Sequence, residues 1–307
     1  MSKIIVTGGS GFLGTHLCKQ LSNENNVVFS PSSTQFNLIN KDKCDELLSY
    51  AGKPDIVIHL AAKCGGIGAN MKNPGSYFYQ NMMMGMNVIE ACRKAKVSKI
   101  VLIGTVCSYP KNCAVPFVES DIWKGFPEET NAPYGIAKKA LYVMLDAYQK
   151  QYGLNSTIIV PTNLYGPHDN FEDSSSHVIP ALIKKIYKAK INNEPNIEVW
   201  GDGSASREFL YVEDAAKAIG KAAYTRTDTR PINIGTGKEI SIKELAYKIK
   251  VLMGYSGDLI FNHNLPNGQP RRCLNTSLAY YSLNFKAQTS LDSGLRNTID
   301  WFVSNSK

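Results

Sequence analysis

The chain has 307 residues, of which 43% are hydrophobic and 20% charged, and its 34 Lys and Arg outnumber its 26 Asp and Glu by 8. This composition excludes an intrinsically disordered chain, which needs low hydrophobicity and high charge density. No apolar run approaches the roughly 20 residues of a membrane span. A strand-like run and glycines begin directly after Lys3, too early for a signal peptide. We therefore expect a cytoplasmic protein with no membrane partner.

The cysteines and the basic residues limit which kinds of binding site the sequence is expected to form. The seven cysteines are odd in number and no close pair has metal-ligand spacing, so we expect free thiols and no metal site. Lysines are spread along the chain, in pairs such as Lys138-Lys139, without the basic stripe of a nucleic-acid reader. A mildly basic surface, or a site for an anionic ligand, explains the charge at least as well as nucleic acid does.

Apolar runs alternate with amphipathic stretches in the first half of the chain. Strands are predicted at 3–7, 27–29, 55–60, 99–103 and 156–160, and long helices at 77–96 and 133–152. This rhythm is typical of right-handed crossovers in a parallel sheet with helices on both faces. The predicted fold class is α/β, with a doubly wound parallel sheet of the Rossmann type.

The rhythm breaks after Pro161. Residues 166–176 form a polar loop pattern, followed by a predicted helix at 178–190 and short strands at 197–200 and 208–211. We predict a dinucleotide-binding domain over residues 1–165 and a smaller α/β substrate-binding domain over 166–307. Residues from about 205 to 235 are expected to return to the first domain, with 231–234 joining the main sheet.

The first predicted strand ends in the sequence TGGSGFLG at 7–14. Glycines allow the backbone to turn tightly and approach a pyrophosphate, and the following helix offers N–H groups and the positive end of its dipole. The strand–turn–helix context therefore predicts a dinucleotide site. Its expected cofactor-binding residues are Gly8, Gly9, Ser10, Gly11, Phe12, Leu13 and Gly14.

The segment after the second strand bears on the choice of cofactor. It reads SPSST at 30–34, with neither a carboxylate to hold the ribose of NAD nor an arginine to hold the phosphate of NADP. Without a carboxylate nothing repels a 2′-phosphate, and hydroxyls such as that of Ser33 can donate to it. NADP(H) is therefore the predicted cofactor.

Tyr134 and Lys138 lie four residues apart, on one face of the second long helix. The ammonium of Lys138 is expected to lower the pKa of the Tyr134 phenol toward a range useful for proton transfer. Thr105, just after the strand at 99–103, is placed to donate a second hydrogen bond to the same carbonyl oxygen. Together with the glycine turn, these residues predict a catalytic site rather than a surface helix pair.

The glycine turn, Thr105, Tyr134 and Lys138 resemble the extended short-chain dehydrogenase/reductase family. A closer resemblance, from the glycine turn to about residue 275, is to the GDP-L-fucose synthase family, NADPH-dependent 3,5-epimerase/4-reductases of GDP-4-keto-6-deoxy-D-mannose. It depends on AAKCGGI at 61–67, YQNMM at 79–83, CSYPK at 107–111, PTNLYGPHDNF at 161–171, SHVIPAL at 176–182 and REFL at 207–210.

The resemblance implies catalytic roles. Tyr134 would protonate the C4 oxygen as hydride arrives, Lys138 would hold the nicotinamide ribose, and Thr105 would support the oxyanion. Cys107 and His177 would be the base and the acid of epimerisation, because a thiol and an imidazole exchange protons near neutral pH.

The resemblance also implies binding residues. The nicotinamide half of the cofactor would meet Pro161, Asn163, Leu164 and His177. The nucleotide sugar would meet Lys185, Trp200, Arg207 and Asn267. Either Arg271 or Arg272 is a further candidate for its diphosphate. Two helices, at 77–96 and 133–152, resemble those of a four-helix dimer interface, so we expect a homodimer.

Some positions depart from the family pattern. Thr105 stands where a serine is usual, Asn267 and Asn275 stand where aspartates are usual, and the 2′-phosphate arginine is missing. One open alternative is an enzyme for a related nucleotide sugar, such as a GDP-4-keto-6-deoxy-heptose, that reduces its substrate with or without epimerisation. The others are a 4-epimerase or dehydratase and a non-catalytic NADP-binding sensor. The sensor predicts loss of Tyr134 or Lys138, and both are present.

Overall fold

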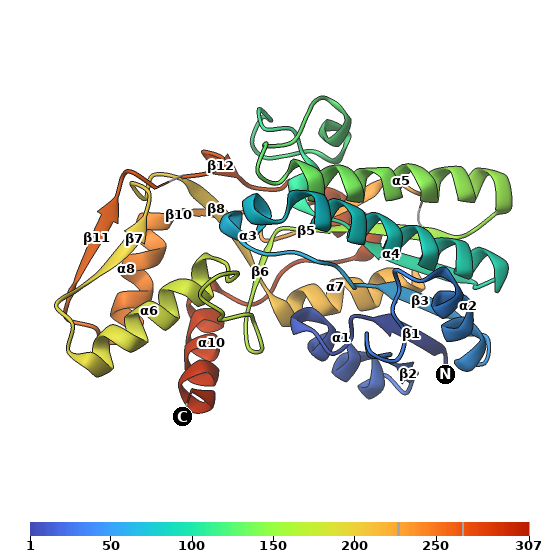
Figure 1. Ribbon diagram of the computed structural model, residues 1–307, viewed down its shortest axis with the longest axis horizontal. Coiled ribbons are helices and arrows are strands. Elements are labelled where there is room, and N and C mark those ends of the chain that lie inside the picture. Colours follow the sequence, from blue (N-terminus) through green and yellow to red (C-terminus); the bar gives the residue numbers. More distant parts are fainter. Residues whose placement is uncertain (226–227, 266, 307) are drawn as a thin grey trace.

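A six-stranded parallel sheet lies at the centre of the computed structural model, which describes residues 1–225, 228–265 and 267–306 (Figure 1). The sheet order is β2-β1-β3-β4-β5-β9, and every neighbouring pair is parallel. The strands are β1 (Lys3–Thr7), β2 (Val27–Phe29), β3 (Ile56–His59), β4 (Lys99–Ile103), β5 (Ser156–Pro161) and β9 (Pro231–Ile234). The predicted fold class is confirmed. The strand order reverses between β1 and β3, where open α/β sheets form a crevice for ligands.

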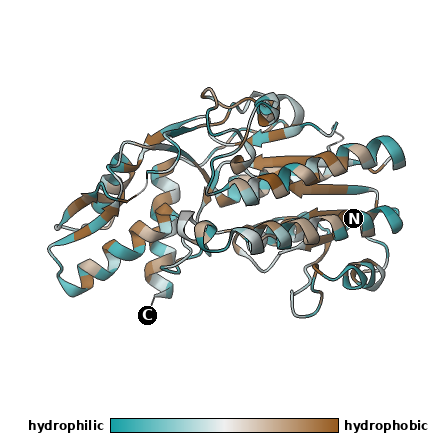
Figure 2. Ribbon diagram, turned by 45° about the horizontal axis from the view of Figure 1, so that its top comes forward, coloured by the Kyte–Doolittle hydropathy of each residue, from teal (hydrophilic) through white to brown (hydrophobic). Residues whose placement is uncertain are grey.

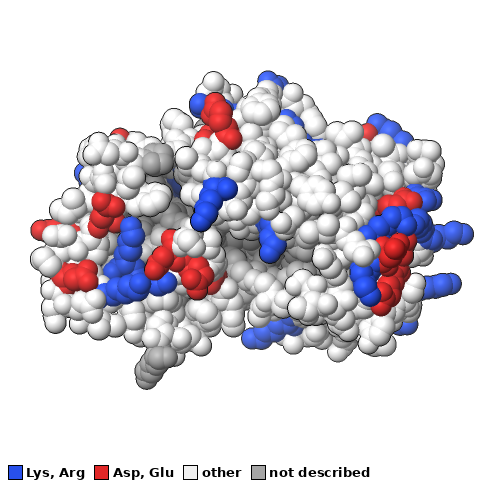
Figure 3. Space-filling model, viewed as in Figure 1, with Lys and Arg blue, Asp and Glu red and all other residues white. Residues whose placement is uncertain are grey.

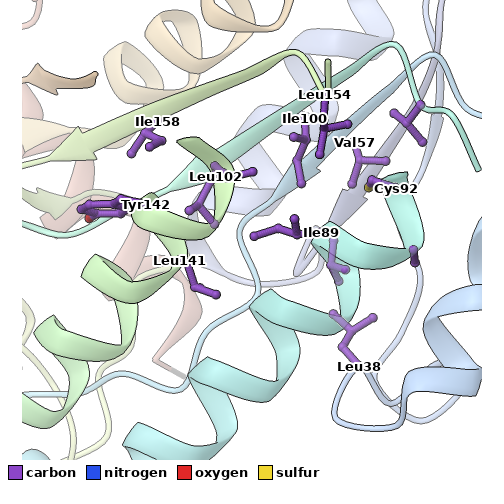
Figure 4. Packing of buried hydrophobic residues seen from close by; sticks show 14 of the residues in the cluster. Leu38, Val57, Ile89, Cys92, Ile100, Leu102, Leu141, Tyr142, Leu154 and Ile158 are labelled. Carbon is purple, nitrogen blue, oxygen red and sulfur yellow. The ribbon is translucent and has the colours of Figure 1, made fainter. Parts of the chain in front are cut away.

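Helices cover both faces of this sheet. Alternate strand residues point to opposite faces, so Ile5, Val57 and Ile100 pack under α2 (Lys41–Tyr50), α4 (Pro74–Lys94) and α5 (Ala132–Tyr152) (Figure 4). Ile4 and Ile58 pack on the other face, against α1 (Phe12–Asn23), α7 (Val212–Tyr224) and α9 (Ser277–Leu283). Burial on both faces explains why the central residues of these strands form continuous apolar runs, as Figure 2 shows.

The sequence interpretation missed several helices of the structure, among them α2 and α3. α2 follows its N-cap residue, Asn40, whose side-chain oxygen accepts from the backbone N–H groups of Asp42 and Lys43. α3 (Ile67–Lys72) is a short helix that directly precedes α4. Because Pro74 can occupy the first turn without losing a needed hydrogen bond, α4 starts three residues before the predicted position.

The chain after residue 161 builds two further sheets. One consists of β6 (Asn163–Tyr165), β8 (Ser206–Tyr211), β10 (Glu239–Ser241) and β12 (Arg271–Arg272). The other pairs β7 (Asn196–Trp200) with β11 (Asp258–Asn262). We call β7, β11 and three helices the small lobe; those helices are α6 (Val178–Asn192), α8 (Ile242–Leu252) and α10 (Leu291–Asn305). The small lobe has its own apolar core and lies at the left of Figure 1.

Residues 205–235 connect the small lobe back to the main sheet. α7 packs on α1, and β9 pairs with β5 at the sheet edge. The division into domains at residue 165 stays a prediction. Two 3₁₀ turns complete the elements, η1 (Val106–Ser108) after β4 and η2 (Glu119–Trp123).

Within the described ranges, no helix is both long and apolar enough to cross a membrane. All seven cysteines have free thiols.

Candidate active site

One cleft of about 830 Å³ collects nearly all of the residues singled out from the sequence. It begins at the carboxyl ends of β1, β3, β4 and β5 and extends to the small lobe. Figure 3 shows the surface hollowed between the small lobe and the main sheet, with basic side chains beside the hollow. Of the predicted catalytic, cofactor-binding and substrate-binding residues, Gly9 alone does not line the cleft.

The glycine turn forms the floor of the cleft between β1 and α1. Gly8 has a φ of +75°, and a Cβ there would lie 2.8 Å from the backbone nitrogen of Ala61. A Cβ on Gly14 would lie 2.2 Å from the carbonyl oxygen of Gly8. α1 begins after Gly11 with no side-chain cap, so its first N–H groups are free to bind an anion. This backbone cradle fits the pyrophosphate of a dinucleotide.

Gly9 does not line the cleft, but packing within the turn requires a glycine at this position. A Cβ there would lie 2.1 Å from the Oγ of Ser30 and 2.9 Å from the Sγ of Cys18, so the residue closes the turn against β2 and α1. The end of the cleft beside β2 is lined by Pro31, Ser33 and residues 36–39, all uncharged. Ser33 thus lies where the sequence placed it, at an end with no carboxylate and no cation among the lining residues.

Tyr134 and Lys138 both lie on the first turns of α5 and face the cleft. The Nζ of Lys138 donates to the carbonyl oxygen of Ile103 at 2.8 Å, and burial lowers its pKa to about 8. The expected effect on Tyr134 is wrong for the free protein. Burial raises the pKa of the phenol well above its usual range, and Cys64 and Cys107 add to the rise. The ammonium of Lys138 is directed instead at a backbone carbonyl.

Thr105 and Cys107 are positioned by the turn that ends β4. The Oγ1 of Thr105 accepts from the backbone N–H of Cys107 at 3.1 Å, and Thr105 also shares a hydrogen bond with the Tyr134 phenol. The hydroxyl of Tyr142 accepts from the backbone N–H of Thr105 at 3.0 Å. Tyr142 lies two helical turns after Tyr134 and went unnoticed in the sequence, although that spacing is the available signal.

His177 lines the same cleft. It is the residue before α6, its side chain is open to the cleft, and it caps no backbone group. Burial lowers the pKa of His177, and the positive charge of Arg272 lowers it further. Pro161, Asn163 and Leu164 also line the cleft, and the Nδ2 of Asn163 donates to the carbonyl oxygen of Glu208 at 2.8 Å.

The predicted substrate residues gather at the end next to the small lobe. The Nζ of Lys185 donates to the carbonyl oxygen of Glu198 at 2.9 Å and lies 5.9 Å from the centre of the Trp200 ring. Arg207, on β8, reaches across to the carbonyl oxygen of Asn267 at 3.2 Å. The side-chain oxygen of Asn267 accepts from the backbone N–H of Asp202, so it braces the neighbouring turn and is already engaged.

Further residues line the cleft without having been predicted as part of the site. Cys64 follows β3 and is close enough to Tyr134, Lys138 and Cys107 to interact with them electrostatically. It lies within the 61–67 motif, at the carboxyl end of a strand, and that position is the signal that was available. Others include Asn70, Asn131 and Gln269. Of the two arginines considered for the diphosphate, Arg272 lines the cleft and Arg271 does not.

Known proteins resemble this chain over nearly its whole length. The sequence pattern of the NAD dependent epimerase/dehydratase family matches residues 4–235. The chain is 40% identical over 303 residues to a GDP-L-fucose synthase of Sinorhizobium fredii, and the match covers 99% of this chain and 96% of the relative.

Two solved structures have the same fold. A GDP-L-fucose synthetase from Naegleria fowleri, bound to NADP, superposes with a TM-score of 0.91 at 28% identity, covering 99% of this chain and 93% of that one. A GDP-6-OMe-4-keto-L-xylo-heptose reductase from C. jejuni superposes with a TM-score of 0.90 at 28% identity, covering 99% and 98%.

Proposed function

The chain belongs to the NAD dependent epimerase/dehydratase family, and from that premise we propose that it epimerises C3 and C5 and reduces the C4 ketone of a GDP-4-keto-6-deoxy sugar with NADPH. The first choice of substrate is GDP-4-keto-6-deoxy-D-mannose, with GDP-L-fucose as the product, because a relative 40% identical to the chain is a GDP-L-fucose synthase. The observation that carries the proposal is the convergence, in one cleft, of Thr105, Cys107, Tyr134, Lys138 and His177.

Reduction needs a hydride and a proton at the two ends of the C4 carbonyl. NADPH, held by the glycine turn, supplies the hydride when bound. Tyr134 gives its phenolic proton to the C4 oxygen; the raised pKa keeps the phenol protonated at neutral pH, ready to donate. Thr105 hydrogen-bonds the phenol and helps orient it. Lys138 holds the cofactor ribose and, with its lowered pKa, can return a proton toward the tyrosine.

Epimerisation uses the same carbonyl. Cys107 removes the proton from C3 or C5, and the electron pair moves onto the C4 oxygen as an enolate, which Tyr134 and Thr105 stabilise. His177 returns a proton to the opposite face of the ring, which inverts the carbon. The two residues come from separate elements that line one cleft, Cys107 from η1 and His177 from the residue before α6.

A second candidate substrate is a GDP-4-keto-heptose. The structural similarity to the C. jejuni heptose reductase, with a TM-score of 0.90, favours it. Retention of both Cys107 and His177 favours an enzyme that epimerises as well as reduces.

Incubation with GDP-4-keto-6-deoxy-mannose and NADPH in deuterated water tests the proposal. We expect NADPH consumption and a product with deuterium at C3 and C5. Reduction without deuterium would identify a pure reductase, and no turnover by folded protein would point to another sugar. Cys107→Ser should block deuterium entry far more than it slows reduction of an already epimerised substrate. Equal exchange in that variant would contradict its role as the base.

We also propose that the protein acts as a homodimer in the cytoplasm. Apolar side chains are exposed along α4 and α5, where Phe78 is 41%, Tyr79 56% and Val143 54% exposed. These two helices pack side by side, so a second copy can complete a four-helix interface. Free thiols fit a reducing compartment. A monomeric mass in light scattering would contradict the dimer.

A further inference from the structure

A buried group of hydrogen bonds joins α5 to the turn that follows β4, behind the wall of the cleft. The hydroxyl of Tyr142 accepts from the backbone N–H of Thr105 at 3.0 Å and lies 3.1 Å from the Oγ of Ser108. The Oγ of Ser108 in turn donates to the carbonyl oxygen of Gly135 at 3.4 Å. Tyr142 is 2% and Ser108 0% exposed, and neither lines the cleft. The phenol of Tyr142 therefore acts on the site only through its partners.

The hydrogen bonds of this group run in one direction. Ser108 has a single hydroxyl proton and gives it to Gly135, so the Tyr142 phenol donates its own proton to Ser108. The phenol oxygen accepts from Thr105, which satisfies the other side of the hydroxyl. Burial raises the pKa of Tyr142 to about 12, so the phenol keeps this proton at neutral pH. Because both side chains are buried, water does not replace a lost partner.

The backbone around these hydrogen bonds is closely packed. A Cβ on Gly104 would lie 2.2 Å from the Tyr142 hydroxyl oxygen, and one on Gly135 would lie 2.2 Å from the carbonyl oxygen of Cys107. η1 therefore rests directly on the backbone of α5. Tyr142 projects from α5 into the apolar layer between this helix and the sheet (Figure 4). Close backbone packing and the phenol together hold the turn that carries Cys107 against α5.

The partners of Tyr142 lie next to the catalytic groups. The Oγ1 of Thr105 accepts from the backbone N–H of Cys107 at 3.1 Å and shares a hydrogen bond with the Tyr134 phenol. Ser108 directly follows Cys107 in η1. We propose that Tyr142 is a positioning residue, whose hydroxyl fixes the turn that carries Cys107 relative to Tyr134. The inference rests on the proposed function for the chemical roles of that thiol and that phenol.

Epimerisation and reduction depend on this turn to different degrees. Tyr134 and Lys138 belong to α5 itself, and Lys138 is held by the carbonyl oxygen of Ile103, so both keep their places without the Tyr142 hydroxyl. The Cys107 thiol is carried by η1. A displacement of about 1 Å in a reacting group costs about 10²-fold in rate. Loss of the hydroxyl should therefore slow proton exchange at C3 and C5 more than hydride transfer to C4.

Tyr142→Phe tests the proposal, because it removes the hydroxyl and keeps the ring. Exchange is measured as deuterium entry at C3 and C5 of saturating GDP-4-keto-6-deoxy-mannose with NADP⁺ as the cofactor, so that no hydride is delivered. Reduction is measured as NADPH oxidation in a single turnover of the epimerised 4-keto sugar. We expect exchange to fall about 10- to 100-fold and reduction less than about 5-fold.

Two further variants show whether the hydroxyl acts through the turn. Ser108→Ala removes one of its two partners and should lower exchange about 3- to 10-fold, again with less effect on reduction. Tyr255→Phe is the matched control: Tyr255 is 6% exposed in the core of the small lobe, and its hydroxyl donates to the carbonyl oxygen of Glu194 at 2.9 Å. This variant should change neither rate.

The ratio of exchange to reduction does not depend on how much of a variant is folded, so a general loss of stability would leave it unchanged. An unchanged ratio in Tyr142→Phe would overturn the positioning role and leave the proposed function standing. Absence of both activities in the wild type would overturn the proposed function.

Alkylation of Cys107 by iodoacetamide, read by mass spectrometry of its peptide, tests the position of the thiol without any sugar. Tyr142→Phe should be alkylated several-fold faster than the wild type, because a loosened turn opens more often, and Tyr255→Phe at the wild-type rate. Equal rates in all three proteins would refute the hold of Tyr142 on η1, whatever the substrate of the enzyme.

Discussion

The two ends of the cleft offer their ligands different kinds of group. At the glycine turn the lining consists of backbone and of uncharged side chains such as Ser10 and Ser33. At the small lobe it carries Lys185, Arg207 and Arg272. A backbone cradle needs only a short contiguous sequence of the right shape, whereas a cluster of cations needs several segments to meet. The first end is therefore local in the sequence, and the second depends on long-range contacts between β8, β12 and α6.

The largest effect is expected from a change at Tyr134, which lies between the two ends of the cleft. Tyr134→Phe removes the proton donor and should lower kcat for reduction by about 10²- to 10⁴-fold while leaving NADPH and GDP affinities near their wild-type values. The measurement is NADPH oxidation with saturating sugar nucleotide. Tyr152→Phe, at the exposed end of the same helix, is the control and should retain full activity. Comparable turnover in the two variants would remove Tyr134 from the chemistry.

The loop that connects the two ends should carry a pH-dependent stability. Asp169 is 8% exposed, its Oδ2 has no hydrogen-bond partner, and burial raises its pKa to about 7. A carboxyl with a raised pKa in the folded state stabilises at low pH, and that stability is lost as the pH rises from about 4 to 7. Asp169→Asn should remove this loss, so the pH profiles of the two proteins should differ by about 4 kcal/mol.

Urea unfolding at a series of pH values measures this difference. The control is Asp173→Asn in the same loop, where ion pairs with Lys184 and Lys188 lower the pKa of the carboxyl. The ionised Asp173 carboxylate contributes little to stability. Its pH dependence is opposite to that of Asp169, because the contribution is lost as the pH falls. Parallel profiles for wild type and Asp169→Asn would show that this carboxyl does not titrate with folding.

The structure of the small-lobe end of the cleft, which is lined by cations, depends on one buried carboxylate. The carboxylate of Glu208, fully buried on β8, accepts from the backbone N–H groups of Thr236 and Gly237 and from that of Leu274 at 2.7 Å, next to β12. Glu208→Gln should destabilise the fold by about 2–3 kcal/mol, because a donor amide replaces an acceptor. It should also weaken GDP binding more than NADP⁺ binding.

Chemical denaturation and the two titrations together test this prediction. Glu239→Gln, on the neighbouring β10 and paired with the surface Arg271, is the control and should change both affinities little. Equal weakening of NADP⁺ and GDP binding in Glu208→Gln would mean that the two ends are not separable.

The smallest effect is expected at the glycine-turn end of the cleft. A Cβ at Gly14 would lie 2.2 Å from the Gly8 carbonyl oxygen and 2.5 Å from the Gly9 Cα, so Gly14→Ala must displace the turn. We expect NADP⁺ affinity to fall about 10- to 100-fold, a cost of about 1.4–2.8 kcal/mol, with GDP affinity unchanged. Gly75→Ala, whose Cβ would meet nothing within 4 Å, is the control. Fluorescence titration measures the NADP⁺ affinity of each variant. Equal affinities in Gly14→Ala and Gly75→Ala would contradict the role of the glycine turn as a cradle for the pyrophosphate.

Much of the main sheet was predictable because its residues carry the pattern directly. Ile4, Val6, Ile56 and Ile58 are apolar since both faces are covered, and the strand–glycine–helix order leaves one parallel topology. α2 was missed because its polar surface hides the helical period, and only the cap at Asn40 marks its start. The short β12 was missed because a two-residue strand has no period at all.

The sequence by itself determined the doubly wound fold, the glycine turn and the spacing of Tyr134 and Lys138, because each depends on residues within one turn or one strand. The tertiary structure decided what no neighbouring residue encodes. It turned Lys138 toward the Ile103 carbonyl and raised the pKa of Tyr134. It also brought Arg272 rather than Arg271 beside Arg207. Side-chain direction on β12 follows from its register with β8, and register is a property of the folded chain.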